Sequence, residues 1–350
     1  MQKPSLGWQS WSPPFPSWHG FPRWDYSPFK TRSLKSTFRE TPERAFKVRY
    51  WCSWYAYGWN ITNHKIRETL SVISKHKLPF THIIIDDGWT TWGDWHAPDS
   101  IRFPNMATTT KLIRKNHLQA GLWFAPFLAN KKSQLFKKHP DWFVKHQGKY
   151  VQGLKTMPVW EWFLPQQYLL NFELPEVKKY ITNFIDLAVN KWGIPLLKLD
   201  FLYAPYFNPL FKSDKLAHNQ VTWLFHYIKS KYPHVQTIAS GAPFTPIVGL
   251  ADIIRISKDT ALPPVVPKLF NQLIYSLRIK MLNLKLSTTN VFSNIAIDPD
   301  VRLFSLDTRS TTPTWDTIRT SVLGVGDNLT SLSTAKLQEI KIWLTNHNSQ

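Results

Sequence analysis

The feature that most constrains the fold is a regular alternation between short apolar, β-prone runs and longer helical segments. Strands that alternate with helices are typical of a parallel sheet. Eight such units in about 300 residues fit a closed (β/α)8 barrel, the TIM barrel. The sequence predicts strands at residues 48–57, 81–89, 120–126, 196–201, 235–240, 252–259, 292–300 and 327–331.

Helical patterns fill most of the intervals between these runs. A doubly wound sheet is the alternative arrangement, but no Gly-rich G-x-G-x-x-G turn follows the first strand, which counts against a dinucleotide-binding fold. A long excursion at residues 130–174 carries no assignable motif. The expected helices cover residues 62–77, 105–117, 176–191, 214–232 and 266–282, a segment from about residue 315, and residues 335–346.

The first 45 residues differ in composition from the rest. They contain the string GWQSWSPPFPSWHGFPRW, which has no helical period, and its prolines oppose pairing in a central strand. We therefore expect two parts: a short Trp/Pro-rich extended arm at residues 1–45, and a catalytic TIM barrel at residues 46–350.

Composition narrows the class of protein. The net charge of +20 arises from Lys and Arg in short scattered clusters, which indicates a solvated basic surface rather than a nucleic-acid footprint. A single cysteine, Cys52, fits a reducing compartment, and the start of the chain lacks the apolar region of a signal peptide. We expect a cytoplasmic protein with no membrane span and no nucleic-acid partner. No CxxC or HExxH zinc spacing is present.

The run from Leu196 to Phe201 places a lysine and an aspartate in a buried strand. Lys198 and Asp200 are two residues apart, so they point to the same side. Two charges on one buried face are costly unless they pair or take part in chemistry. The run alone is open to two interpretations: a structural ion pair, or a lysine that lowers the pKa of an aspartate nucleophile.

Charged residues recur at the carboxyl ends of the predicted strands. Barrel active sites form at this end, and carboxylates that converge in one place repel each other, so the asymmetry predicts an active site. The residues are Asp86 and Asp87 on the second strand, Lys198 and Asp200 on the fourth, Arg255, Ser257 and Asp259 on the sixth, and Asp298 and Asp300 on the seventh.

Two carboxylates on separate strands suit glycoside hydrolysis. Asp200, beside Lys198, is the better nucleophile, and Asp259 is the better general acid. Asp86 and Asp87 would accept hydrogen bonds from sugar hydroxyls. Tryptophan rings could stack on a sugar face or simply pack in the core; the candidates are Trp54, Trp89, Trp123 and Trp160.

These residues resemble the α-galactosidases of glycoside hydrolase family 36, in the melibiase clan. The resemblance implies a retaining mechanism without a cofactor, with Asp200 as nucleophile and Asp259 as acid/base. It also implies that Asp86 and Asp87 hold the galactose 4- and 6-hydroxyls, and that Lys198 and Arg255 bind substrate and tune charge. The matching strings, in family order, are WCSWYAY (51–57), IDDGW (85–89), GDW (93–95), GLWFAP (121–126), LKLDF (197–201), SGAP (240–243), RISKD (255–259) and DPD (298–300).

The chain also departs from the family pattern. We expect the arm to retain at most a remnant of an N-terminal β-sandwich, in GWQSW (7–11), and we expect no C-terminal β-domain, which leaves the oligomeric state open. Ser240 stands where related sequences commonly carry cysteine, near the sugar 2-position, which leaves the preference at C2 open.

The sequence thus predicts a retaining hydrolase of terminal α-linked galactose in oligosaccharides or glycoconjugates. Four alternatives stay open. The first is a galactosyl transferase of the raffinose-synthase type, and the second is a related α-glycosidase with a different C2 preference. The third is a barrel that only binds glycans, and the fourth is nucleic-acid association through the charge of +20.

Overall fold

The computed structural model describes residues 48–350 apart from residues 155–165, 244–245, 288–295, 318–319, 321 and 347–350. The predicted arm at residues 1–45 lies outside these residues, and the division into arm and barrel stays a prediction. No helix among the described residues is long and apolar enough to cross a membrane.

A parallel sheet forms the centre of the molecule. Its strand order is β11-β10-β9-β8-β3-β2-β1-β13-β12. The terminal strands β11 and β12 are separated along the chain only by Pro299 and Asp300, so the chain itself joins the two ends of the sheet. The strands are β1 (Val48–Cys52), β2 (His82–Ile85), β3 (Gln119–Phe124), β8 (Leu196–Leu199), β9 (Gln236–Ala239), β10 (Ile253–Arg255), β11 (Ala296–Asp298), β12 (Val301–Arg302) and β13 (Val322–Val325).

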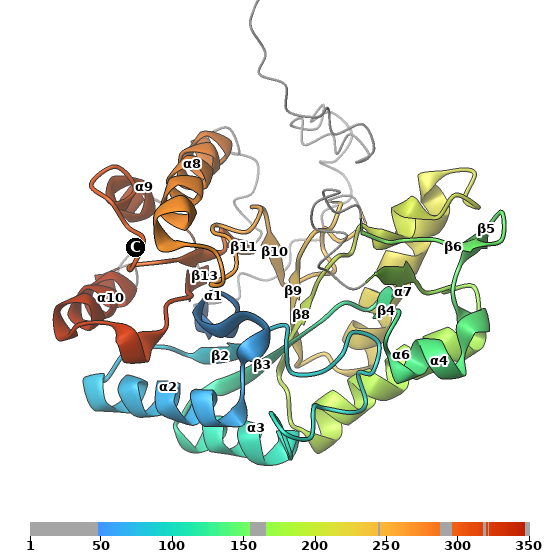
Figure 1. Cartoon of the computed structure of the whole chain (residues 1–350), viewed down its shortest axis with the longest axis horizontal. Coiled ribbons are helices and arrows are strands. Elements are labelled where there is room, and N and C mark those ends of the chain that lie inside the picture. The colour runs from blue at the N-terminus through green and yellow to red at the C-terminus, as the bar shows by residue number, and fades with distance from the viewer. Residues whose placement is uncertain are drawn as a thin grey trace, which may run out of the picture.

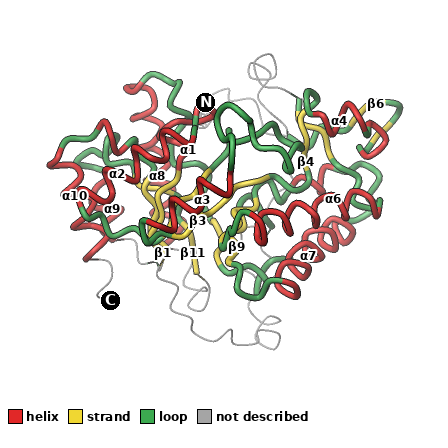
Figure 2. Tube along the Cα trace, turned by 90° about the horizontal axis from the view of Figure 1, so that it is seen from below, coloured by secondary structure: helices red, strands yellow, loops and turns green. Residues whose placement is uncertain are grey.

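Helices surround these strands, as Figures 1 and 2 show from two directions. In Figure 1, α2 and α3 lie below the strands, α6 and α7 to one side, and α8, α9 and α10 to the other. The helices are α1 (Ser53–Tyr57), α2 (Asn63–His76), α3 (Met106–Lys115), α4 (Gln134–Lys138), α6 (Pro175–Asp186), α7 (Asp214–Lys231), α8 (Lys268–Ser287), α9 (Thr312–Thr317) and α10 (Thr334–Asn346).

Local sequence explains where several helices begin. The Thr62 hydroxyl accepts a hydrogen bond from the Lys65 amide at the start of α2, and the Asn105 side chain does the same for the Thr108 amide at the start of α3. Helix α6 begins at Pro175, where the missing amide hydrogen costs nothing. The strands are buried on nearly every residue, as expected for a parallel sheet covered on both faces.

The predicted (β/α)8 fold is confirmed, but several elements differ. The strand predicted at residues 252–259 ends at Arg255, and β12 was not predicted. The run at residues 48–57 is a strand only to Cys52, and α1 comes directly after it. The last strand is Val322–Val325 rather than residues 327–331, where Leu329–Ser331 forms a 3-10 turn whose Asn328 side chain accepts from the Thr330 amide. Within the 130–174 excursion, the structure has short antiparallel pairs, Lys145–His146 with Lys149–Tyr150, and Gln167–Leu169 with Leu128–Asn130.

Candidate active site

The site lies at the carboxyl ends of the parallel strands, where side chains from different strands meet. Lys198 on β8 reaches Asp86 after β2, and Trp123 on β3 reaches Asp200 after β8. Strands β8, β3 and β2 are neighbours in the sheet, in that order, so parallel pairing brings these groups together at one edge.

Lys198 pairs with Asp86. Its Nζ lies 2.6 Å from Asp86 Oδ2, and both side chains are buried. The Cys52 thiol also donates to Asp86 Oδ2, at 3.2 Å, and Ser53 Oγ accepts from the Asp86 amide at 2.9 Å. The prediction that Lys198 pairs with Asp200 is therefore wrong. The lysine side chain extends toward the second strand and pairs with Asp86 instead.

Asp200 is held by two donors. Trp123 Nε1 donates to Oδ2 at 2.9 Å, and the Phe201 amide donates to Oδ1 at 2.7 Å. Phe201 has a φ of 53°, which is unusual for a residue with a side chain and turns the chain directly after the carboxylate. Burial raises the pKa of Asp200, although the charges of Lys198 and Arg255 oppose that rise. The prediction that Lys198 would set this pKa below its usual value is wrong, because desolvation outweighs the positive charges.

Asp87 accepts hydrogen bonds from two indoles. Trp59 Nε1 donates to Oδ2 and Trp92 Nε1 to Oδ1, each at 2.7 Å. Burial raises the pKa of Asp87 to about 7, with the two indole hydrogen bonds acting against the rise. A carboxyl group in this state can donate or accept a hydrogen bond near neutral pH.

Arg255 joins the sixth strand to the seventh. Its Nη2 lies 2.8 Å from Asp259 Oδ1 and 2.9 Å from Asp300 Oδ2. The Tyr55 hydroxyl donates to Asp300 Oδ2 at 2.5 Å. Arg255 and Asp300 are buried, whereas the Asp259 side chain is 49% exposed and accessible to a ligand.

The predicted stacking tryptophans take other positions. Trp89 is fully buried and packs against Trp95, Phe184 and Trp192, which contradicts a place on a sugar face. Trp123 is also buried, and what it offers the site is its indole hydrogen bond to Asp200.

Three further predicted residues have different outcomes. Trp54 is half-buried and meets Trp59 edge to face. Ser240 is buried at the end of β9, and its hydroxyl has no hydrogen-bond partner in the part of the chain that the structure describes. Trp160 lies outside the described residues.

Sequence reasoning missed Tyr55, Trp59 and Trp92. Tyr55 lies within the run predicted as one continuous strand, Trp59 comes just after that run, and Trp92 lies in a loop. Their hydrogen bonds depend on segments that fold back over the strand ends, and the only available signal was the density of aromatic residues near the string IDDGW (85–89). No periodicity rule assigns a partner to an indole in a loop.

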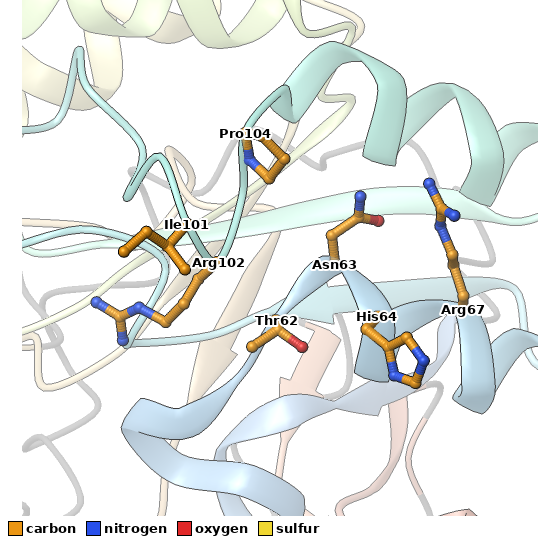
Figure 3. Close-up of a pocket in the computed structure, with 7 residues that line it drawn as sticks. All are labelled: Thr62, Asn63, His64, Arg67, Ile101, Arg102 and Pro104. Carbon is orange, nitrogen blue, oxygen red and sulfur yellow. The ribbon is translucent and has the colours of Figure 1, made fainter.

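Figure 3 shows a separate surface pocket of about 330 Å³. It lies at the start of α2, contains none of the carboxylates described above, and touches the site only indirectly, because Arg102 donates to the Trp59 carbonyl oxygen at 2.5 Å. Its lining residues are Thr62, Asn63, His64, Arg67, Ile101, Arg102 and Pro104.

Among the described residues, no group of three or more His, Cys, Asp or Glu side chains is arranged to hold a metal ion. The acidic side chains are instead occupied by lysine, arginine, indole and phenol donors. What the arrangement offers is two carboxylates, Asp200 and Asp259. Asp259 contacts the Arg255 guanidinium directly, and the Arg255 charge acts on Asp200 through space.

Fold and site together define a (β/α)8 barrel whose acidic and basic side chains converge at the carboxyl ends of its strands. The model of the Melibiase family matches residues 26–243, which is more than half of the chain. The chain therefore belongs to the Melibiase family.

Named relatives agree with this assignment. Over 171 residues the chain is 32% identical to a probable α-galactosidase C of Aspergillus flavus, covering 43% of this chain and 21% of the relative. Over 172 residues it is 30% identical to α-galactosidase 2 of Hypocrea jecorina, covering 44% of this chain and 22% of the relative. The chain thus matches only about a fifth of the length of these relatives.

Solved structures match over more of the chain. The α-galactosidase TtGalA from Thermus thermophilus, in complex with stachyose, has 26% sequence identity and a TM-score of 0.66, covering 85% of this chain and 64% of that chain. The complex of the same enzyme with p-nitrophenyl α-D-galactopyranoside has 28% identity and a TM-score of 0.65.

Proposed function

We propose that this chain hydrolyses terminal α-linked galactose from oligosaccharides by a retaining mechanism. Membership of the Melibiase family and the likeness to an α-galactosidase that binds stachyose support the substrate class. The observation that supports the mechanism is the geometry of two carboxylates: Asp200 is partly buried and held by two donors, and the Asp259 side chain is 49% exposed and lies 2.8 Å from Arg255.

Asp200 serves as the nucleophile. The hydrogen bonds from Trp123 and from the Phe201 amide fix its two oxygens, so one of them can face the anomeric carbon. Asp200 attacks C1 while the bond to the leaving oxygen breaks, and the negative charge passes to that oxygen. Burial, which raises the pKa of Asp200, strengthens its basicity and hence its attack.

Asp259 serves as the general acid and then as the general base. Its exposed carboxyl group gives a proton to the leaving oxygen as the first bond breaks. In the second step it takes a proton from the water that attacks C1, and Asp200 is released with net retention. Asp86 and Asp87 bind sugar hydroxyls, and the indoles of Trp59 and Trp92 orient Asp87.

The test compares wild type with Asp200→Ala and Asp259→Ala on an aryl α-galactoside. We expect near-complete loss of turnover in Asp200→Ala, with external azide restoring it and giving the inverted galactosyl azide. For Asp259→Ala we expect a loss of about 10²–10⁴-fold on galactosides with poor leaving groups, because protonation of the leaving oxygen is lost.

Asp141→Ala is the matched control, because this exposed aspartate lies in the excursion outside the site. Wild-type activity in Asp200→Ala would overturn the proposal. Product analysis with excess acceptor sugar separates hydrolysis from transfer. If the main product is a galactosylated sugar, the acceptor is a sugar and not water, and the chain is a transferase.

A further inference from the structure

Arg255 holds two carboxylates with one nitrogen atom. Nη2 lies 2.8 Å from Asp259 and 2.9 Å from Asp300. The two partners differ sharply in exposure, since the Asp300 side chain is 2% exposed and that of Asp259 is 49% exposed. Asp259 can therefore exchange protons with a ligand or with water, whereas Asp300 faces only protein groups.

Asp300 is fixed by several donors that converge on its Oδ2 atom. Besides Arg255, this oxygen accepts from the Tyr55 hydroxyl at 2.5 Å, from the Thr260 amide at 2.8 Å and from the Thr260 hydroxyl at 3.1 Å. Because every partner donates, Asp300 accepts as a carboxylate. Thr260 directly follows Asp259, so Asp300 also anchors the main chain beside the acid/base residue.

The backbone at Asp300 is itself unusual. Its φ of 73° lies in the left-handed region, and its amide donates to Asp298 Oδ1 at 2.9 Å. Such a conformation is costly for a residue with a side chain and persists where the surroundings impose it, commonly at functional sites. This conformation thus occurs at the residue whose carboxylate contacts Arg255, directly after the seventh strand.

We propose that Asp300 is a positioning residue for Asp259: it compensates the charge of Arg255 and anchors Thr260, so that Asp259 can take up and return a proton during turnover. This inference rests on the proposed retaining mechanism, and goes beyond it by assigning a residue that touches neither the sugar nor the reacting atoms.

The electrostatic argument depends on the sharing of one guanidinium. A carboxylate that is alone with a buried arginine is stabilised in its charged form, which opposes general acid catalysis. A second carboxylate on the same nitrogen cancels part of that positive charge. Other charged and titratable groups act on the Asp259, Arg255 and Asp300 cluster through space. They are Tyr50 and Cys52 of the first strand, Tyr55 after it, Lys198 and Asp200 of the fourth, Tyr203, and Asp298 of the seventh. Arg278 of α8 donates to the Asp259 carbonyl oxygen at 2.6 Å.

The test is the pH dependence of Asp300→Asn, which keeps the size of the side chain and removes its charge. With Arg255 uncompensated, Asp259 loses its proton more easily. We expect the basic limb of the kcat/KM profile to move to lower pH by about one to two pH units. The resulting loss of kcat/KM at basic pH should appear with alkyl galactosides. It should be absent with 2,4-dinitrophenyl galactoside, whose leaving group needs no proton.

Two variants keep the inference falsifiable. Asp307→Asn is the matched control, because it also removes a buried arginine partner, Arg302 at 2.7 Å, but outside the site, so it should lose stability without moving the limb. Tyr55→Phe keeps the Asp300 charge and removes one hydrogen bond, and we expect a loss of about 3–10-fold confined to poor leaving groups, with no move of the limb to lower pH.

The outcomes separate this inference from the proposed function. An unchanged limb in Asp300→Asn overturns the role of Asp300. If Asp300→Asn does not fold, Tyr55→Phe provides the test. The role of Asp300 is overturned if Tyr55→Phe loses activity equally on both classes of leaving group, or loses none. If Asp259→Ala itself shows no dependence on the leaving group, the proposed mechanism fails whatever Asp300 does.

Discussion

Replacement of Lys198 by methionine should destabilise the protein severely, because it leaves Asp86 charged and buried. The Lys198 and Asp86 side chains are 8% and 5% exposed, and their charged atoms lie 2.6 Å apart. In Lys198→Met, Asp86 Oδ2 keeps only the weak Cys52 thiol as a side-chain donor among the described residues. Removing one partner of a buried pair costs about 3–5 kcal/mol. That is a large part of the roughly 5–15 kcal/mol that stabilises a typical domain.

Urea unfolding followed by tryptophan fluorescence measures this loss. We expect the midpoint to fall by about 1 M or more with an unchanged slope, which is the signature of a change in stability alone. Although burial lowers it, the adjacent Asp86 carboxylate raises the pKa of Lys198 above its ordinary value overall. Because the pKa of Lys198 is higher in the folded protein, its ion pair contributes its full stabilisation at every pH below the lysine pKa of the unfolded chain, about 10.4. The lysine contribution should therefore be constant between about pH 5 and pH 9.

A pair of double-mutant cycles identifies the partner of the lysine. For Lys198→Met with Asp86→Asn, we expect a coupling free energy of about 2–3 kcal/mol, since the two charged atoms are in contact. For Lys198→Met with Asp200→Asn, a coupling of about 1 kcal/mol or less is expected, because that pair interacts only through space.

An exposed pair provides the control. Lys336 Nζ lies 2.7 Å from Glu339 Oε2, but these side chains are 37% and 52% exposed, so Lys336→Met should cost at most about 1 kcal/mol. A stronger coupling of Lys198 to Asp200 than to Asp86 would refute the reasoning. It would mean that the lysine stays on its own strand, as its spacing from Asp200 indicates.

Two further predictions concern Asp87 and Trp89. Burial raises the pKa of Asp87 to about 7, so its contribution to stability is complete below the unfolded value of about 4 and is lost as pH rises through 7. Asp87→Asn should therefore gain stability relative to wild type between pH 5 and pH 8, by about 3 kcal/mol at most. An equal difference in the free energy of unfolding by urea at both pH values would contradict this. Because Trp89 is a core residue, Trp89→Ala should lose about 3–5 kcal/mol of stability. Trp89→Phe should leave the KM for an aryl galactoside unchanged. A raised KM in a folded Trp89→Phe protein would restore the sugar-stacking interpretation.

The fold was predictable because its signal is repeated along the chain. Apolar runs such as Leu196–Leu199 are buried on every residue, and helices alternate with them, so local patterns and global topology agree. The eighth strand was misplaced because Val322–Val325 contains Gly324, which is atypical of strands. Glycine is required there because a Cβ atom would come within 2.5 Å of the Tyr50 ring.

The pairing of side chains was not predictable from spacing. Period two places Lys198 and Asp200 on one side of a strand, but does not say which group faces them across the barrel. The same limit applies to Tyr55 and Trp59, because the chain leaves the strand at Cys52 and strand alternation no longer assigns a direction to the side chains beyond it. Cross-strand partners depend on which strands pair and on loop conformation, and neither has a local signature.

The convergence of carboxylates, which in the sequence indicates an active site, is tolerated because each one is compensated differently. Asp86 has the Lys198 ammonium, Asp300 has the Arg255 guanidinium, and Asp87 has two indoles and a pKa of about 7. These partners reduce the repulsion among the acidic groups. None of them covers the part of the Asp259 side chain that faces solvent. Asp200, held by one indole and one amide, is left without a direct ion pair among the described residues. Asp200 thus has no ion pair within the described ranges, and about half of the Asp259 side chain is exposed, which supports the roles proposed for these two carboxylates.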